Sequence, residues 1–156
     1  MKNLSLTSLA VSKVFAGGFA KPGELPHLVA LRTKASNTHF CGASIIHPYL
    51  LLCAAHCFTN QRAPFIQIVA GEHDRMKSDG NREQVRDVTL VDTHEKYDNV
   101  TWVNDIAILV LNESLEFNDY VKPIKLREPD WNLPGLNFPK YSHPFGNAKL
   151  FFYHNF

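Results

Sequence analysis

One histidine in this sequence stands where an imidazole can do acid–base chemistry. His56 lies in the run Ala54-Ala55-His56-Cys57, directly after the apolar residues 50–53. A turn at the end of a buried strand lets the ring face a cleft while the core holds the backbone. Because the charge of histidine changes near neutral pH, His56 is a candidate general base and acid. The alternative is a structural histidine bonded to a backbone carbonyl.

An aspartate occupies a similar place. Asp105, in Asn104-Asp105-Ile106-Ala107, opens an apolar run that continues to Leu111. A carboxylate beside a buried strand is costly unless it is paired or hydrogen-bonded. An imidazole is a suitable partner, because accepting its Nδ1–H fixes the tautomer and stabilises the imidazolium. We therefore expect Asp105 within hydrogen-bonding distance of His56. A cap at the start of the strand is the alternative.

The three cysteines, Cys41, Cys53 and Cys57, leave several arrangements open. An odd count fits one disulfide plus a buried thiol, a metal site, or a partner elsewhere. Cys41 lies in one expected strand and Cys57 follows the next, so we expect these two to form a disulfide with Cα atoms about 4.4–6.8 Å apart. Cys53 then stays reduced. The alternative is a Cys₃His zinc site with His56, although the second knuckle of ligands typical of zinc domains is missing.

Six short apolar segments could position these residues. They are rich in β-branched residues and are separated by turn residues at intervals of about ten, and no segment shows sustained helical periodicity. The pattern predicts an all-β barrel or sandwich, and six strands would close a small barrel and so remove exposed edges. The expected strands are residues 27–32, 40–46, 49–54, 65–70, 84–91 and 105–111.

The two ends depart from this pattern. Residues 1–13 read as a weak signal or pro segment, because their apolar run is diluted by Ser and Thr and stops at Lys13. We expect the barrel domain to span 14–135 and an irregular aromatic tail to occupy 136–156, either as a docking surface for a partner or as an alternative exon end. The tail contains no Asp or Glu and carries Phe138, Tyr141, Phe145, Phe151, Phe152, Tyr153 and Phe156.

Composition limits the partners. The 156 residues carry a formal net charge of +1, so no strong field favours nucleic acid or an anionic membrane surface. No run approaches the roughly 18 continuous apolar residues of a membrane span. We expect a soluble protein without a nucleic-acid partner or a membrane span, and an extracellular, secreted location.

Further runs accompany the His56 and Asp105 motifs. They are Ala16–His27, with a glycine pair and a Gly-x-x-Pro segment, Cys41-Gly42-Ala43-Ser44-Ile45-Ile46, and Phe117–Leu126. In this order and spacing the runs resemble the trypsin and chymotrypsin family of serine proteases. The resemblance implies an all-β fold, a six-stranded antiparallel Greek-key barrel that is the first barrel of a two-barrel fold. It further implies that His56 is the general base and acid and that Asp105 orients it. It also implies endoproteolysis of protein or peptide substrates through an acyl-enzyme, with no required cofactor.

The sequence departs from the family at the nucleophile. The Gly-Asp-Ser-Gly-Gly stretch that supplies the serine is absent, and Ser114 and Ser142, the serines that follow Asp105, lack flanking glycines. We therefore expect a truncated or incomplete form that is inactive alone; the alternative is a non-catalytic, protease-like binding module. Activation by cleavage after Lys13 is also in doubt, because one residue too many precedes Gly17.

Two further features follow from the resemblance, and a third follows from the sequence itself. Glu72, Asp74, Asp79 and Glu83 resemble the calcium-binding loop of the family, with a solvated acidic loop as the alternative. Trp102 is expected to border the substrate cleft, with a surface aromatic that stabilises its own loop as the alternative. Asn99 and Asn112 begin glycosylation sequons, which matter only if the chain is secreted.

Overall fold

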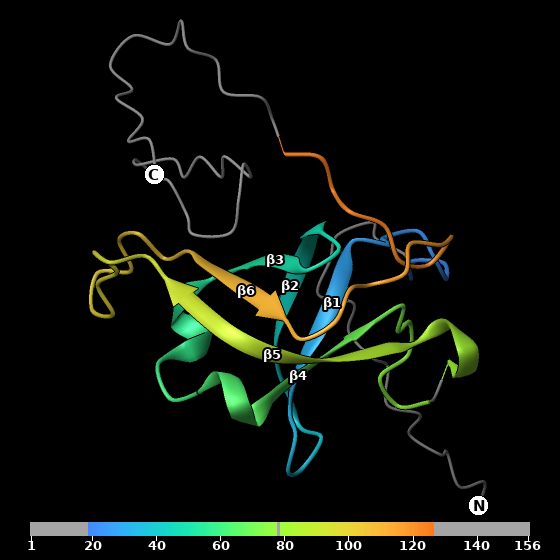
Figure 1. The fold of residues 1–156 in the computed structure, drawn as a ribbon, viewed down its shortest axis with the longest axis horizontal. Helices are drawn as coiled ribbons and strands as arrows, with labels where there is room; N and C mark the ends of the chain where they lie inside the picture. The colour runs from blue at the N-terminus through green and yellow to red at the C-terminus, as the bar shows by residue number, and fades with distance from the viewer. Residues whose placement is uncertain (1–18, 78, 127–156) are drawn as a thin grey trace, which may run out of the picture.

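Six antiparallel strands close into a barrel in the computed structural model, which describes residues 19–77 and 79–126 (Figure 1). Neighbouring strands follow the order β1-β2-β3-β6-β5-β4, and β4 pairs with β1 to close the sheet. This confirms the all-β, six-stranded prediction. The strands are β1 (Leu28–Thr33), β2 (His39–His47), β3 (Leu50–Cys53), β4 (Ile66–Ala70), β5 (Gln84–Thr93) and β6 (Ala107–Leu111).

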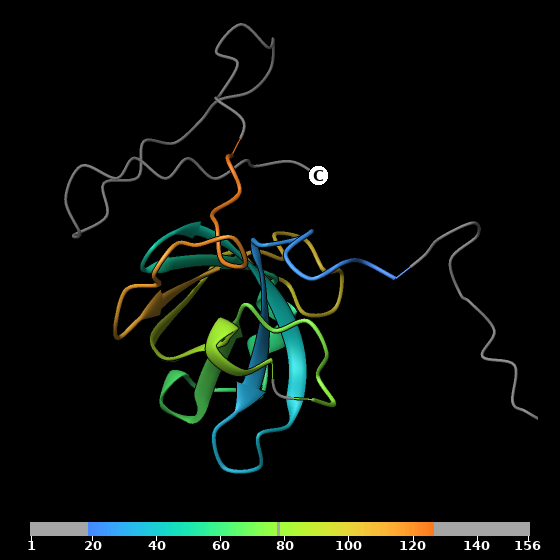
Figure 2. The same cartoon turned by 90° about the vertical axis from the view of Figure 1, so that its right-hand side faces the viewer.

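The connection between β3 and β4 makes the barrel a Greek key. β1, β2 and β3 pair in sequence order, whereas β4 returns to lie beside β1, which gives the spatial order β4-β1-β2-β3. β6 then fits between β3 and β5. Figure 2 shows the same strands after a quarter turn. Because β3 and β6 are neighbours, residues about 50 positions apart in the sequence meet at one end of the barrel.

Alternate residues of each strand fill the barrel, as the period of two along a strand requires. Leu31, Ile45, Leu51, Ile68 and Leu109 come from five different strands, and each is fully buried. Each buried aliphatic side chain contributes about 1.5–3 kcal/mol relative to leaving it exposed. The apolar alternation therefore fixes which face of every strand points inward.

Four strands, β1, β3, β4 and β6, begin one or two residues later than predicted, and all six agree with the prediction to within two residues at each end. Phe65 ends a 3₁₀ turn, η2 (Ala63–Phe65), whose proline suits the first turn of a helix, so β4 begins at Ile66. Asp105 precedes β6, because Asn104 has a left-handed backbone (φ 60°) that delays the ladder until Ala107. The other 3₁₀ turns are η1 (Ala55–Phe58) and η3 (Gly80–Arg82).

The segment after β6 runs back along the segment before β1, as the orange and blue traces show in Figures 1 and 2. The backbone N–H of Lys122 donates to the carbonyl oxygen of Pro26 at 2.9 Å, and that of Ile124 donates to Ile45 at 2.8 Å. Leu25 and Leu28 remain exposed near this contact. Among the residues that the structure describes, no helix is long and apolar enough to cross a membrane.

Gly71 follows the last residue of β4 and has a left-handed backbone (φ 76°), and a Cβ added there would lie 2.1 Å from the carbonyl oxygen of Arg82. We expect Gly71→Ala to destabilise the fold by well over 1 kcal/mol, because both the backbone angle and the contact oppose a side chain. Urea denaturation measures the loss. Gly80→Ala is the matched control: its φ is also left-handed (64°), but its Cβ would meet nothing within 4 Å, so it should cost only about 1 kcal/mol. Equal losses in the two variants would contradict the explanation by steric contact.

Candidate active site

The pairing of β3 with β6 brings the two motif residues together. Cys53 at the end of β3 is paired with Ala107 at the start of β6. His56 lies three residues past Cys53, in η1, and Asp105 lies two residues before Ala107. Both side chains therefore lie at the same end of the barrel, at the junction where the two strands meet.

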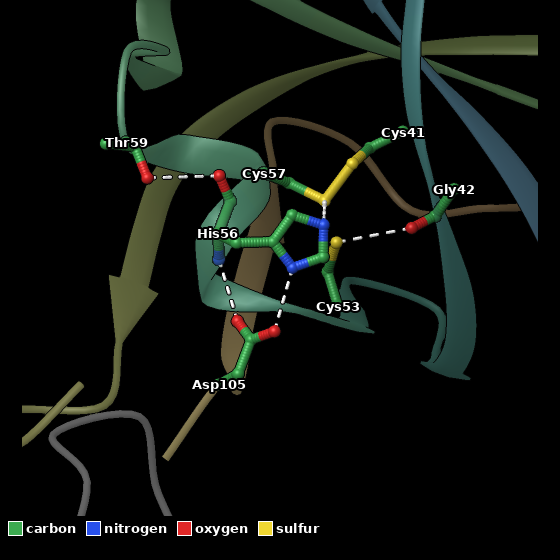
Figure 3. The surroundings of a disulfide bond; sticks show 7 residues. All are labelled: Cys41, Gly42, Cys53, His56, Cys57, Thr59 and Asp105. Carbon is green, nitrogen blue, oxygen red and sulfur yellow. Dashed lines mark hydrogen bonds and ion pairs between the residues drawn. A yellow bond between two sulfur atoms is a disulfide. The ribbon is translucent and has the colours of Figure 1, made fainter. Parts of the chain in front are cut away.

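Asp105 binds His56 through both carboxylate oxygens (Figure 3). Oδ2 lies 2.8 Å from the ring Nδ1, and Oδ1 accepts a hydrogen bond of 2.8 Å from the backbone N–H of His56. The histidine side chain is 39% exposed and the aspartate side chain 20% exposed. The carboxylate thus fixes both the ring and the backbone of the residue that it faces.

The surroundings favour an ionised Asp105. Burial raises the pKa of its carboxyl, but hydrogen bonds from the ring and backbone of His56 outweigh burial and leave the pKa below its usual value. An ionised carboxylate can only accept a hydrogen bond from Nδ1–H, so the hydrogen-bond network assigns the neutral imidazole its Nδ1–H tautomer.

The second ring nitrogen of His56 is left without a donor in the described part of the chain. Its Nε2 lies 3.6 Å from Sγ of Cys57, and that sulfur has no hydrogen to donate because it is in a disulfide (Figure 3). The Nε2 lone pair is therefore available to accept a proton from a group brought to the exposed side of the ring.

The disulfide prediction is confirmed. Cys41 and Cys57 are bonded, and their Cα atoms lie 6.1 Å apart. The alternative zinc site was wrong: ligand atoms of Cys41, His56 and Cys57 do lie within 4.8 Å of one another, but disulfide sulfurs are not thiolates and cannot bind zinc as such. Cys53 is a buried free thiol that donates to the carbonyl oxygen of Gly42 at 3.2 Å.

Trp102 contacts His56 directly. The two ring centroids lie 4.8 Å apart with the planes tilted by 39°, and the indole is 56% exposed. Trp102 has a left-handed backbone (φ 61°), which nothing in the sequence indicated; for Asn104, its residue type alone was a weak signal. Asp98 holds this turn, because its carboxylate accepts the N–H of Val100 and its carbonyl accepts the N–H of Trp102.

The four acids of the predicted calcium loop face cations or N–H groups of the chain itself. Glu72 forms an ion pair with Arg32 of β1, a partner that the sequence analysis missed. Asp79 binds Arg82 at 2.8 Å and also accepts two backbone N–H groups, while Glu83 accepts the N–H of Asp79 at 2.6 Å. Asp74 lies 3.8 Å from Lys77. Cations and N–H donors of the chain itself thus surround these carboxylates, and the arrangement does not fit a calcium ion.

Comparison with known proteins gives one consistent result. The family model described as Trypsin matches residues 14–136. Coagulation factor IX of Oryctolagus cuniculus is 36% identical over 130 residues, which are 81% of this chain and 45% of that protein. Suppressor of tumorigenicity 14 protein homolog of Bos taurus is 31% identical over 129 residues, which are 79% of this chain and 15% of that protein. The chain spans less than half the length of these curated relatives.

Cys53 should resist alkylation in the folded protein. Burial raises the pKa of its thiol to about 11, so hardly any reactive thiolate is present at pH 8. We expect no iodoacetamide adduct on Cys53 after native labelling and complete labelling in urea, read by mass spectrometry. Cys41 and Cys57 should stay unlabelled in both samples until a reductant is added. Rapid native labelling of Cys53 would show that the end of β3 is open.

Asp105→Asn should lower the melting temperature at pH 7. Because the folded-state pKa of Asp105 is lowered, its carboxylate stabilises the fold above the ordinary pKa of about 3.9, and this contribution is lost as the pH falls through the folded value. The difference in melting temperature between Asp105→Asn and the parent protein should therefore become smaller from pH 7 to pH 3, as measured by circular dichroism. Asp119→Asn, which removes a carboxylate from an exposed pair with Lys122, should change little at either pH. A difference in melting temperature that does not depend on pH would show that the charge of Asp105 is not what stabilises the fold.

Proposed function

Because the chain belongs to the trypsin family, we propose that it supplies the base-bearing barrel of a serine-type endopeptidase. The observation that supports this most directly is the hydrogen bond of 2.8 Å between Asp105 and Nδ1 of His56, with Nε2 left to accept a proton. In this proposal His56 is the general base and acid and Asp105 the residue that orients it. In trypsin-like proteases such a pair acts together with a serine as a catalytic triad.

The proposed reaction assigns one task to each ring nitrogen. Nε2 takes the proton of a serine hydroxyl as the oxygen attacks the scissile carbonyl, and later returns that proton to the leaving amine. Nδ1–H stays bonded to Asp105, whose negative charge stabilises the imidazolium that forms between these steps. Asp105 has a lowered pKa, so it stays ionised throughout. The products are an acyl-enzyme and an amine, and water then releases the acyl group.

Two parts of this reaction need residues other than those of the barrel. A nucleophilic serine has to reach Nε2, and two backbone N–H groups have to face the oxyanion. The sequence has no Gly-Asp-Ser-Gly run to provide either. We propose that a second barrel provides both in a longer product, and that the substrates are proteins or peptides.

The disulfide beside the site supports a secreted protein. Disulfides persist in oxidising compartments and are rare in the cytosol. The bond between Cys41 and Cys57 packs against the proposed base, so a reducing compartment would threaten the site itself. Secretion can be checked by expressing the native transcript and assaying the medium.

A longer product is the direct test of the proposed function. Sequencing the full transcript should reveal a Gly-Asp-Ser-Gly run downstream, and the purified product should cleave peptide substrates. His56→Ala should lower its kcat by at least about 10⁴-fold, whereas His47→Ala, which changes a histidine at the end of β2, should leave kcat nearly unchanged. Full activity in His56→Ala would reject the proposed base; a product that binds peptides without cleaving them would favour the binding module.

The 156-residue chain alone should not hydrolyse peptide bonds. Removing one triad member leaves a residual catalysis of about 10³–10⁴ over water, which comes from the oxyanion hole and substrate binding. The barrel has the base but no nucleophile to activate, so peptide esters should be hydrolysed at the background rate. A serine-directed phosphonate probe should label neither Ser114 nor Ser142, the latter of which lies outside the described residues. Labelling of Ser142 that disappears in His56→Ala would overturn this expectation.

A further inference from the structure

A buried carboxylate with an internal partner lies at the base of the 71–83 loop. The side chain of Glu72 is only 7% exposed, and that of Arg32, 40 residues away in β1, is 13% exposed. The two form an ion pair, and Arg32 also donates to the side-chain oxygen of Asn37 at 3.3 Å. A pair this well buried differs from the surface pairs of the molecule, because each member would be costly without the other.

The loop is closed so tightly that it brings negative charges together. Gly71 and Arg82 approach so closely that no Cβ fits between them, and Glu72 and Glu83 directly follow these two residues. Burial raises the pKa of Glu72 above its usual value, Arg32 lowers it, and the charge of Glu83 raises it further. A positive charge is therefore needed where the two ends of the loop meet.

The chain provides this charge from β1. Arg32 acts on Glu72 both through its charge and through its hydrogen bond, and Arg75 adds a smaller attraction from within the loop. At the other end of the loop, Arg82 binds Asp79. Among the described residues, the side chains that gather as potential metal ligands are Cys41, His56 and Cys57, and none of the acids of the loop is among them. The guanidinium of Arg32 is thus paired with Glu72, one of the carboxylates that the family resemblance assigned to calcium.

We propose that Arg32 replaces a divalent cation as the charge that holds the 71–83 loop, so that the loop is stable without calcium. The positive charge of Arg32 is permanent, because a guanidinium does not lose its proton in proteins and, unlike a bound ion, cannot dissociate from the chain. It connects the loop to β1 and thereby to the barrel. The inference does not depend on the proposed protease function, since it concerns the folding of a loop remote in sequence from His56 and Asp105.

The first test uses the unaltered chain. We expect the melting temperature in 5 mM EDTA and in 5 mM calcium chloride to agree within about 1 °C, because ligand binding would shift it by mass action. Isothermal titration with calcium chloride should show no saturable heat. A rise of several degrees with calcium, or saturable binding, would overturn the proposal.

The second test removes the guanidinium. Arg32→Gln leaves Glu72 ionised, buried and next to Glu83, so the melting temperature at pH 8 should fall on the order of 10 °C. Lys34→Gln is the matched control on the same segment. Lys34 forms a pair of 2.9 Å with the half-exposed Asp87, and its loss should lower the melting temperature by no more than about 3 °C.

The pH dependence of the loss in melting temperature tests whether the carboxylate of Glu72 is the partner of Arg32. Without Arg32 the pKa of Glu72 should rise further, so the unpaired charge costs stability at pH 8 and less as the pH falls towards 5. The difference in melting temperature between Arg32→Gln and the parent protein should therefore become smaller as the pH falls. His39 also responds to this change, because burial, Arg75 and Arg32 lower the pKa of its ring. The two contributions therefore have to be separated.

The double variant Arg32→Gln/Glu72→Gln separates them. It retains any effect at His39 but has no buried carboxylate, so it should recover most of the melting temperature at pH 8 and lose most of the pH dependence. A double variant as unstable as Arg32→Gln would show that Arg32 acts through packing or through His39, and would overturn the proposal.

Discussion

The register between β3 and β6 is the constraint on which the candidate site depends. Cys53 faces Ala107 across the ladder, and His56 and Asp105 leave the barrel just beyond these two residues. A slip of one residue would turn Leu109 out of the core and carry Asp105 about 3.3 Å along the strand. Because Leu109 is fully buried, the hydrophobic core opposes that slip. The hydrogen bond of 2.8 Å between the two side chains is thus a consequence of apolar packing a few residues away.

Two carboxylates show how the fold places charge. Asp105 accepts hydrogen bonds from the ring N–H and the backbone N–H of His56, so its ionised form is favoured although the side chain is largely buried. Glu72 is more deeply buried and lies near Glu83, so burial dominates and Arg32 offsets only part of the cost. The first arrangement leaves a nitrogen of the partner available for proton transfer. The second pairs the carboxylate with a guanidinium that does not lose its proton, which suits a structural role.

Much of this could be predicted from the sequence, because the relevant patterns are local. Alternating apolar residues predicted the six strands, and the placement of Cys41 and Cys57 on successive segments predicted the disulfide. The pairing of Arg32 with Glu72 could not be predicted in this way, because no sequence motif links these two residues, which lie 40 positions apart. The left-handed backbone of Trp102 left no sequence signal, because large side chains rarely adopt it.

The turn that carries Trp102 shows how local strain is maintained beside the site. Trp102 and Asn104 both have left-handed backbones, which cost an L-residue with a large side chain roughly 1–2 kcal/mol. Asp98 offsets this cost through its hydrogen bonds to Val100, Thr101 and Trp102. The indole of Trp102 therefore lies against the imidazole of His56. The same imidazole also lies beside the disulfide, through Sγ of Cys57. His56 is therefore bounded by three groups of different chemistry, a carboxylate, a disulfide and an indole, and only the carboxylate exchanges a hydrogen bond with the ring. Such an environment restricts the orientation of the ring without consuming the lone pair of Nε2, which is the property that a general base requires.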